Sequence, residues 1–322
     1  FPGGMLLGAL LLLNLLSAHI RRFKLRWEKA SMILVHTGIV LMLLGELFTA
    51  LLSEESQMRL DEGKTSNHSV SPREVELALV ETGDDGISIV YAIPSSRLRE
   101  GAVFRFDGFE LRVVRFFRNS ELADARTAGQ GFDPMRADRG MGTALAVKAK
   151  PHVTAMDRRD LTSAFVEIHG DDGTTGRWLL SNTMPGEEEF QAKGKTWKMA
   201  IRQQRFYHPF SIRLLDFTHE RYLGTQIPKN FSSRIRLINP DTGEDRETLI
   251  YMNHPLRYAG LTFYQHGFEN KDRTSILQVV RNPAWTMPYI SCAMVGLGLV
   301  WIFCQRLANA FGRRRKSAAV DQ

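Results

Sequence analysis

Residues 30–52 read ASMILVHTGIVLMLLGELFTALL, and this apolar run determines the class of fold. A helix of these 23 residues would be about 34 Å long at about 1.5 Å per residue, enough to cross a hydrocarbon core of about 30 Å. Two other apolar windows, Met5–Ala18 and Trp285–Phe303, lie before and after it, and the stretch from 53 to 284 is mostly polar. We therefore predict a membrane protein with three transmembrane α-helices in this sequence and one large polar domain.

Positive charges predict how these helices are oriented. Residues 19–29 hold five Lys or Arg against one Glu, and Arg306 and the run RRRK at 313–316 follow the last apolar window. Such clusters stay in the cytoplasm, so the polar domain is expected on the opposite side. The N-terminus would also lie outside, and we therefore expect a further span before Phe1, which gives four in the full chain. The net charge of +7 is then mainly a topology signal and does not indicate nucleic-acid binding.

The predicted organisation follows from these windows. We expect a transmembrane helix, cut short by the start of the sequence, at 1–18, a cytoplasmic basic loop at 19–29, a transmembrane helix with His36 at 30–52, a β domain outside the cytoplasm at 53–283, a transmembrane helix at 284–305 and a cytoplasmic basic tail at 306–322.

The polar domain shows short β-type runs separated by turn signals. Residues 75–94 place two such runs around Gly-Asp-Asp-Gly, 103–117 place Asp107-Gly108 between alternating runs, and 232–252 surround Asn-Pro-Asp-Thr-Gly. We therefore predict a large all-β domain, an antiparallel sandwich or open barrel. The stretch 108–117 is similar to 209–218, which indicates two related modules, although convergent alternation explains the likeness about as well.

Cysteines and common catalytic motifs exclude several functions. The two cysteines, Cys292 and Cys304, both lie in the last apolar window, about 18 Å apart along a helix, so they cannot pair within the chain. The sequence has no His-Glu-x-x-His, Cys-x-x-Cys, Gly-x-Ser-x-Gly, P-loop or Cys-x-x-Cys-His motif. The polar domain can therefore hold no disulfide and perform no thiol exchange, and the chain is not itself a c-type cytochrome.

His36 is the principal candidate for a functional residue. An ionisable side chain inside a span is costly and marks a function by default. Imidazole is a common axial ligand of haem iron, but Gly38 and Gly45 favour close helix packing, so a purely packing role stays open. His36 lies about six residues, or about 9 Å, from the inner end of its helix. Glu46, ten residues further on and nearer the outer end, points about 80° away and need not act with His36.

The histidines of the polar domain are weaker candidates. His152, His208 and His254 each neighbour a proline, as residues at strand ends often do, and His266 lies within a β-type run. A structural role is favoured for all four. His254 and His266 are kept as secondary candidates for cofactor binding.

Three segments resemble the ResB-type cytochrome c biogenesis proteins, also called the ResB/CcsB family. VHTGIVLMLLG at 35–45, followed by Asp-Glu-Gly-Lys at 61–64, is similar to the family's histidine-bearing span and its first outer strand. Residues 210–244 are a second likeness. The third is YMNHPLRYAGLTFYQHGFE at 251–269, which resembles the family's Asn-x-Pro-Leu-x-Tyr-x-Gly-x-x-x-Tyr-Gln run. The stretch 118–200 matches weakly.

The resemblance implies a function in the haem delivery pathway called System II. The family's members lie in the bacterial inner membrane as multi-pass proteins, with the large domain in the periplasm and four spans. They pair with a ResC- or CcsA-type membrane protein, and the pair transports reduced haem b across the bilayer for covalent attachment to apocytochrome c. The histidine that matches His36 is an axial ligand of haem iron in the family, which favours the ligand role for His36.

Two other functions remain open at this stage. The chain could be a haem-free scaffold or chaperone that stabilises the partner subunit or binds apocytochrome c through its β domain. It could also be an unrelated membrane-anchored β-sandwich that binds another ligand, which the likeness at 251–269 argues against. Covalent attachment of haem to apocytochrome c would be catalysed by a haem-lyase complex of which this chain is one part. The sequence therefore assigns no catalytic residue to this chain.

Overall fold

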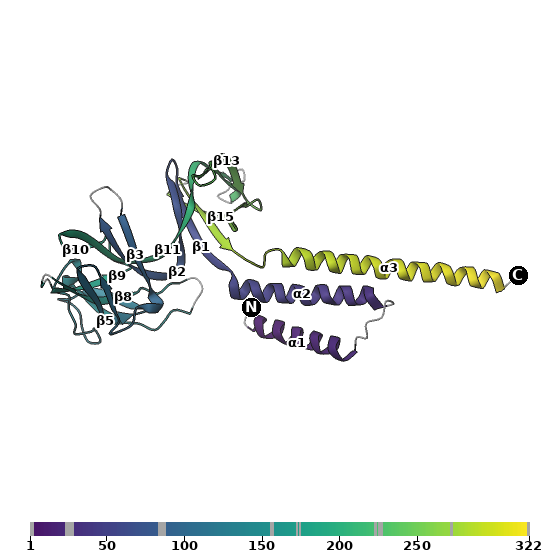
Figure 1. Cartoon of the computed structure of the whole chain (residues 1–322), viewed down its shortest axis with the longest axis horizontal. Helices are drawn as coiled ribbons and strands as arrows, with labels where there is room; N and C mark the ends of the chain where they lie inside the picture. The colour runs from purple at the N-terminus through teal and green to yellow at the C-terminus, as the bar shows by residue number, and fades with distance from the viewer. Residues whose placement is uncertain are drawn as a thin grey trace. The chain divides into compact units, whose positions relative to one another are not determined.

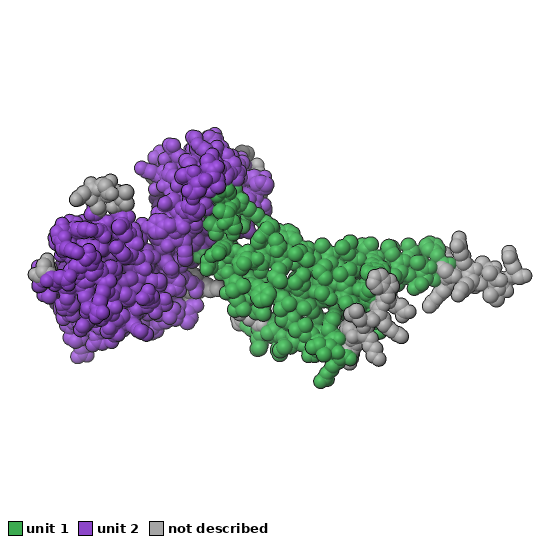
Figure 2. All heavy atoms as spheres, viewed as in Figure 1, with its two compact units in different colours: residues 1–55, 256–263, 280–322 green, residues 56–255, 264–279 purple. Residues whose placement is uncertain are grey.

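The computed structural model describes residues 3–22, 29–82, 88–154, 158–171, 173, 175–221, 224, 228–270 and 273–320. These residues form two compact units (Figure 2). The first unit, a helical unit, comprises residues 1–55, 256–263 and 280–322, and the second, a β unit, comprises residues 56–255 and 264–279.

The helical unit holds three helices (Figure 1). They are α1 at Gly4–Arg22, α2 at Ala30–Leu52 and α3 at Met287–Val320. Two segments, Ala30–Leu52 and Met287–Phe311, are long and apolar enough to cross a membrane, which agrees with two of the predicted spans. The apolar part of α1 is shorter, at Leu6–Arg21, so a span there stays a prediction. Helix α3 continues through the predicted basic tail.

Polar side chains join the C-terminal end of α2 to the segment that precedes α3. The amide nitrogen of Asn282 donates to the Thr49 hydroxyl at 3.1 Å, and the Asn282 amide oxygen accepts the backbone N–H of Ala284 at 2.9 Å. Pro288 follows in the first turn of α3, where its missing N–H costs no helical hydrogen bond. These contacts determine where α3 begins, one turn after the last strand.

Aromatic residues at the start of α3 hold a short strand. The guanidinium of Arg257 lies 4.4 Å from the centre of the Trp285 ring and donates to the Tyr289 hydroxyl at 3.3 Å. Arg257 belongs to a hairpin whose two-residue turn, Ala259-Gly260, has positive φ angles of 48° and 76°. Both turn residues have the left-handed conformation that tight hairpin turns require.

The β unit contains most of the sixteen strands that the described residues form. The strands are β1 at Glu54–Asp61, β2 at Thr65–Thr82, β3 at Ser88–Pro94, β4 at Val103–Phe106, β5 at Phe109–Phe117, β6 at Ser120–Asp124, β7 at Leu145–Ala149, β8 at Ser163–Gly170, β9 at Thr175–Ser181, β10 at Glu188–Ala192, β11 at Lys195–Arg221, β12 at Pro228–Asn239, β13 at Glu244–Tyr251, β14 at Leu256–Tyr258, β15 at Leu261–Glu269 and β16 at Thr274–Arg281. Short 3-10 helices follow β3 and precede β7, at Ser95–Arg97 and Met141–Ala144.

The paired strands are antiparallel, as the sequence predicts. One large sheet runs in the order β13-β12-β11-β2-β1-β16-β15-β14, with β3 paired to β2 and β10 paired to β11. A second sheet has the order β4-β5-β8-β9, and β6 pairs with β7. The predicted hairpins at 103–117 and 232–252 are confirmed by the pairs Phe106↔Phe109 and Asn239↔Glu244. The similar stretches 108–117 and 209–218 lie in different sheets, so their relatedness stays a prediction.

An apolar core forms a sandwich between the two sheets. Leu77 and Leu79 of β2 and Met199 of β11 are buried in one cluster with Leu111 of β5 and Val166 of β8. Aromatic rings fill its end, because Phe109 meets Trp197 edge to face at 4.9 Å and Phe190 at 5.0 Å. Such ring pairs contribute about 0.5–1.5 kcal/mol each beyond their buried area.

Candidate functional site

His36 lies half-buried on α2, and its own helix determines its tautomer. The ring atom Nδ1 is 2.9 Å from the carbonyl oxygen of Met32, one turn earlier. A carbonyl oxygen can only accept, so Nδ1 carries the proton and the lone pair of the neutral ring is on Nε2. Histidines that bind metals usually donate their other ring N–H in this way, to a backbone carbonyl or a carboxylate.

A second histidine, His19 of α1, lies against His36. Its Nδ1 is 2.9 Å from the carbonyl oxygen of Leu15, so its lone pair is also on Nε2. The two rings meet edge to face, with 5.2 Å between their centres and 73° between their planes. Two imidazoles of the same tautomer therefore lie side by side, each from a different helix.

Sequence reasoning missed His19 because it assigned that residue to a loop. The predicted loop at 19–29 begins too early, since α1 continues to Arg22. A signal was available in the spacing. His19 lies near the end of one apolar segment and His36 near the start of the next, and a short basic stretch joins them. An antiparallel pair of helices brings two such positions to the same level.

Glycines on another face of α2 allow its close packing against α3. A Cβ atom at Gly38 would lie 2.8 Å from Val295 Cγ2, and one at Gly45 would lie 2.9 Å from Met287 Cβ. The same closeness holds at Gly298 of α3, where a Cβ would lie 2.6 Å from Val35 Cγ2. The glycines thus let α2 and α3 pack closely, as predicted, while the ring of His36 meets α1.

The histidine pair suits a cofactor that needs one or two imidazole ligands. Within the described ranges, no group of three or more His, Cys, Asp or Glu side chains could hold a metal ion. A haem iron, by contrast, is held by its porphyrin and needs only an axial ligand from the protein. The two rings are in contact, so they leave no room for an iron atom between them. The arrangement therefore fits one imidazole as the axial ligand and the other as its packing neighbour.

The other predicted candidates lie elsewhere. Glu46 is exposed on α2, ten residues or about 15 Å from His36 along the helix. His254 is exposed in the turn after β13, and its ring stacks on Tyr251 with 4.7 Å between the centres. His266 is exposed on β15. The structure brings none of these three into the histidine pair.

Two further histidines of the β unit are held in partly buried positions. His208 lies within β11, where its Nε2 is 3.1 Å from the Ser69 hydroxyl. Burial lowers the pKa of His208, and the neighbouring His68 lowers it further. Burial also lowers the pKa of His68, with Arg205 and Arg202 adding electrostatic repulsion. The lowered pKa values favour the neutral form of both rings.

Comparisons with known proteins match the second half of the chain. Residues 181–276, from the end of β9 to β16, match the ResB-like family. The chain is also 31% identical over 103 residues to Protein NrfI of Wolinella succinogenes, an alignment that covers 32% of this chain. The aligned part of the chain spans only 11% of the length of Protein NrfI. Helices α1 and α2, which carry the histidine pair, precede the residues matched to the family.

Proposed function

From the match of residues 181–276 to the ResB-like family, we propose that this chain is a ResB-type protein and a membrane subunit of a cytochrome c biogenesis complex. Its role would be to handle reduced haem b across the bacterial inner membrane and to support the covalent attachment of haem to apocytochrome c. The two apolar helices long enough to span a bilayer support the membrane location. The family match supports the biogenesis function. We also propose the partners, a ResC- or CcsA-type membrane protein and apocytochrome c.

One observation supports haem handling most directly, namely the His19–His36 pair. Both rings present the Nδ1–H to a backbone carbonyl, which places the lone pair on Nε2. We assign axial ligation of haem iron to Nε2 of His36, and we assign to His19 the role of packing against that ring and fixing its orientation. When bound, haem supplies the iron and the vinyl groups that are eventually joined to cytochrome cysteines. This chain contributes binding and orientation.

The basic residues support a position of this pair near the cytoplasmic surface. The cluster at 19–29 lies between the two histidine-bearing helices, and positive clusters of this kind stay in the cytoplasm. Haem would enter there, and the β unit would lie in the periplasm. A ResC- or CcsA-type membrane protein would supply the remaining haem contacts, so enzyme activity belongs to the complex and not to this chain alone.

A second function, that of a haem-free scaffold, is favoured by strand β3. Among the described strands, β3 pairs only with β2, and Ile89, Val90 and Tyr91 are exposed along it. An unpaired strand edge with apolar side chains can add an extended peptide. In this alternative the β unit would bind apocytochrome c or stabilise the partner, and the histidine pair would only pack.

Cytochrome c maturation in cells separates the two functions. In a strain that lacks the gene, we expect His36→Ala to restore less than about a tenth of mature cytochrome c, because one axial ligand is lost. Imidazole in the medium should restore part of it by occupying the vacated position. His169→Ala, an exposed histidine of β8 that is not a candidate ligand, serves as the matched control and should behave as wild type.

The scaffold function predicts another pattern. His36→Ala would then mature cytochrome c normally, and imidazole would have no effect. Loss of the whole chain would lower the amount of the partner protein in the membrane. Normal maturation by His36→Ala, with the variant present at wild-type levels, contradicts the haem-ligand proposal.

A further inference from the structure

A basic cavity lies in the β unit, away from the histidine pair in sequence. Its volume is about 320 Å³, and its walls come from β2, the end of β5 and the loop between β7 and β8. The basic residues that line it are Arg73, Arg118, His152, Arg158 and Arg159. Ligand pockets in proteins range from about 300 to 1,000 Å³, so the cavity suits a small ligand.

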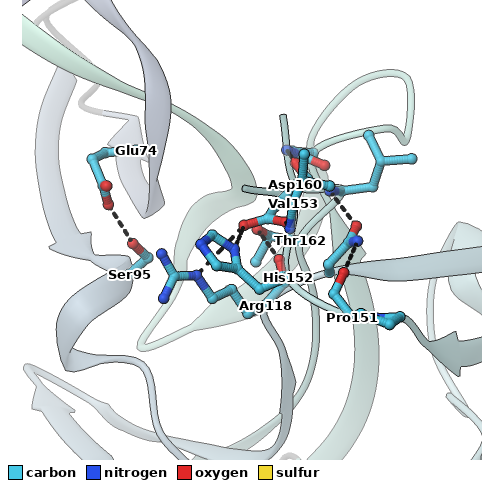
Figure 3. A network of polar contacts seen from close by, with 11 residues as sticks. Glu74, Ser95, Arg118, Pro151, His152, Val153, Asp160 and Thr162 are labelled. Atoms are coloured by element: carbon cyan, nitrogen blue, oxygen red, sulfur yellow. Dashed lines mark hydrogen bonds and ion pairs between the residues drawn. The ribbon is translucent and has the colours of Figure 1, made fainter. Parts of the chain in front are cut away.

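Asp160 lines the cavity, and neighbouring groups of the protein bind both oxygens of its carboxylate (Figure 3). Its Oδ1 accepts the backbone N–H of Val153 at 2.8 Å. Its Oδ2 accepts the Nδ1–H of His152 at 2.5 Å and lies 3.4 Å from Nε of Arg118. The carboxylate is only 12% exposed. It therefore positions His152 and Arg118 and leaves little negative charge facing the cavity.

The loop that carries His152 is fastened at both ends. The Asn119 amide nitrogen donates to the carbonyl of Pro151 at 2.6 Å, and its amide oxygen accepts the N–H of Leu161 at 3.0 Å. The Thr162 hydroxyl donates to the carbonyl of Arg118 at 2.9 Å. Figure 3 shows His152 and Arg118 beside Asp160. These two side chains are thus held in place before a ligand binds, which reduces the cost of ordering them.

The charge of the lining favours an anion. Four arginines stand against two carboxylates, Glu74 and Asp160, which leaves a formal charge of +2 with His152 neutral. Glu74 accepts a hydrogen bond from the Ser95 hydroxyl at 3.3 Å. In the described part of the chain, neither Arg158 nor Arg159 forms an ion pair or a side-chain hydrogen bond. Two guanidinium groups therefore remain at the cavity with their donors directed to solvent or ligand.

We propose that this cavity binds a small oxyanion, a carboxylate or a phosphate, through the guanidinium groups of Arg118, Arg158 and Arg159. Guanidinium forks match both anions by forming two parallel N–H···O bonds. The ring of Phe116 and the buried side chain of Val75 form an apolar wall, which suits a ligand with a short hydrocarbon body. This site is separate from the proposed haem ligation and does not depend on it.

Binding of two defined probes to the purified full chain tests the proposal. Calorimetric titrations with citrate and with inorganic phosphate, in zwitterionic detergent at constant ionic strength, determine which oxyanion is preferred. We expect at least one of them to bind, and Arg158→Gln/Arg159→Gln to weaken that binding by about tenfold or more, as expected when charged hydrogen bonds are lost. Both arginines are exposed, so the variant should unfold at the wild-type temperature.

A control with the same change in net charge excludes general electrostatic attraction. Arg105→Gln/Arg112→Gln removes two exposed arginines of β4 and β5 that pair with Glu110, outside the cavity. It should change the affinity by less than about twofold, because exposed charges are well screened by salt. Equal weakening in both double variants, or no binding of either probe to the wild-type chain, would overturn the proposal.

Discussion

Hydrogen bonding within a helix determines what each imidazole of the pair can do. In both His19 and His36 the Nδ1–H is satisfied by a carbonyl four residues earlier, which lowers the cost of keeping the ring in an apolar segment. The same bond directs the lone pair away from the helix backbone. One local contact therefore accounts both for the tolerance of the residue and for its suitability as a ligand.

The buried histidines of the β unit lead to a prediction about pH. The pKa values of His68 and His208 are lowered in the folded chain, mainly by burial, while the unfolded chain keeps a pKa of about 6.5. As the pH falls through about 6.5, the unfolded state takes up protons that the folded state refuses, so the free energy of unfolding decreases. The contribution is complete above that pH and is lost as the pH falls toward the folded pKa values.

Urea unfolding at pH 7.5 and pH 5.5, followed by tryptophan fluorescence, measures this effect. The wild-type midpoint should fall between the two pH values, and His68→Gln/His208→Gln should show a smaller fall. His266→Gln changes an exposed histidine and should leave the fall unchanged. If the double variant loses as much stability as the wild type on acidification, the buried histidines are not its cause.

At the scale of elements, the glycines of α2 lead to a prediction about helix packing. A Cβ at Gly38 would lie 2.8 Å from Val295 Cγ2 and 3.0 Å from the carbonyl oxygen of Ser291. Gly38→Ala therefore forces α2 and α3 apart and should cost about 1–3 kcal/mol, as overpacking commonly does. Gly296→Ala in α3 is the matched control, because its Cβ would meet nothing within 4 Å.

Thermal unfolding in detergent, followed by helical circular dichroism, compares the two variants. Gly296→Ala should be neutral or stabilising by up to about 1 kcal/mol, because alanine favours a helix over glycine. Gly38→Ala should melt at a lower temperature than wild type. A Gly38→Ala variant as stable as Gly296→Ala would show that α2 and α3 do not pack through this face.

The elements differ in how far the sequence predicts them. Helix α2 and the hairpin at Asp107-Gly108 follow from local signals, namely an unbroken apolar run and a turn whose glycine has a φ of 94°. Strand β6, at Ser120–Asp124, has no such local signal. Its five residues show no clear alternation, and their order comes from pairing with β7, twenty residues later.

The sites were less predictable than the elements, because they depend on contacts between distant residues. His36 is visible in the sequence as an imidazole among apolar residues, but its neighbour His19 depends on how two helices pair. The reading of His152 as a strand-end residue was wrong, because it lies in a loop bonded to Asp160. Arg73 and Arg158 line the same cavity although they are far apart in the chain, and no local sequence pattern predicts that they lie close together.

At the scale of the whole molecule, the chain divides its properties between two units. The helical unit has the candidate spans and the histidine pair, and the β unit has the basic cavity. The likeness to the ResB-like family covers residues 181–276, mostly in the β unit. The histidine pair lies outside the residues matched to the family, and the proposed function rests on both observations.

The absorption spectrum of the reduced chain, purified with the membrane proteins that accompany it, tests the central claim most directly. The wild type and the His169→Ala control should show the bands of b-type haem. His36→Ala should lose most of them, and added imidazole should restore them, because the vacated position again holds a nitrogen ligand. Full haem occupancy in His36→Ala, with unchanged bands and no response to imidazole, would contradict the assignment of His36 as a haem ligand.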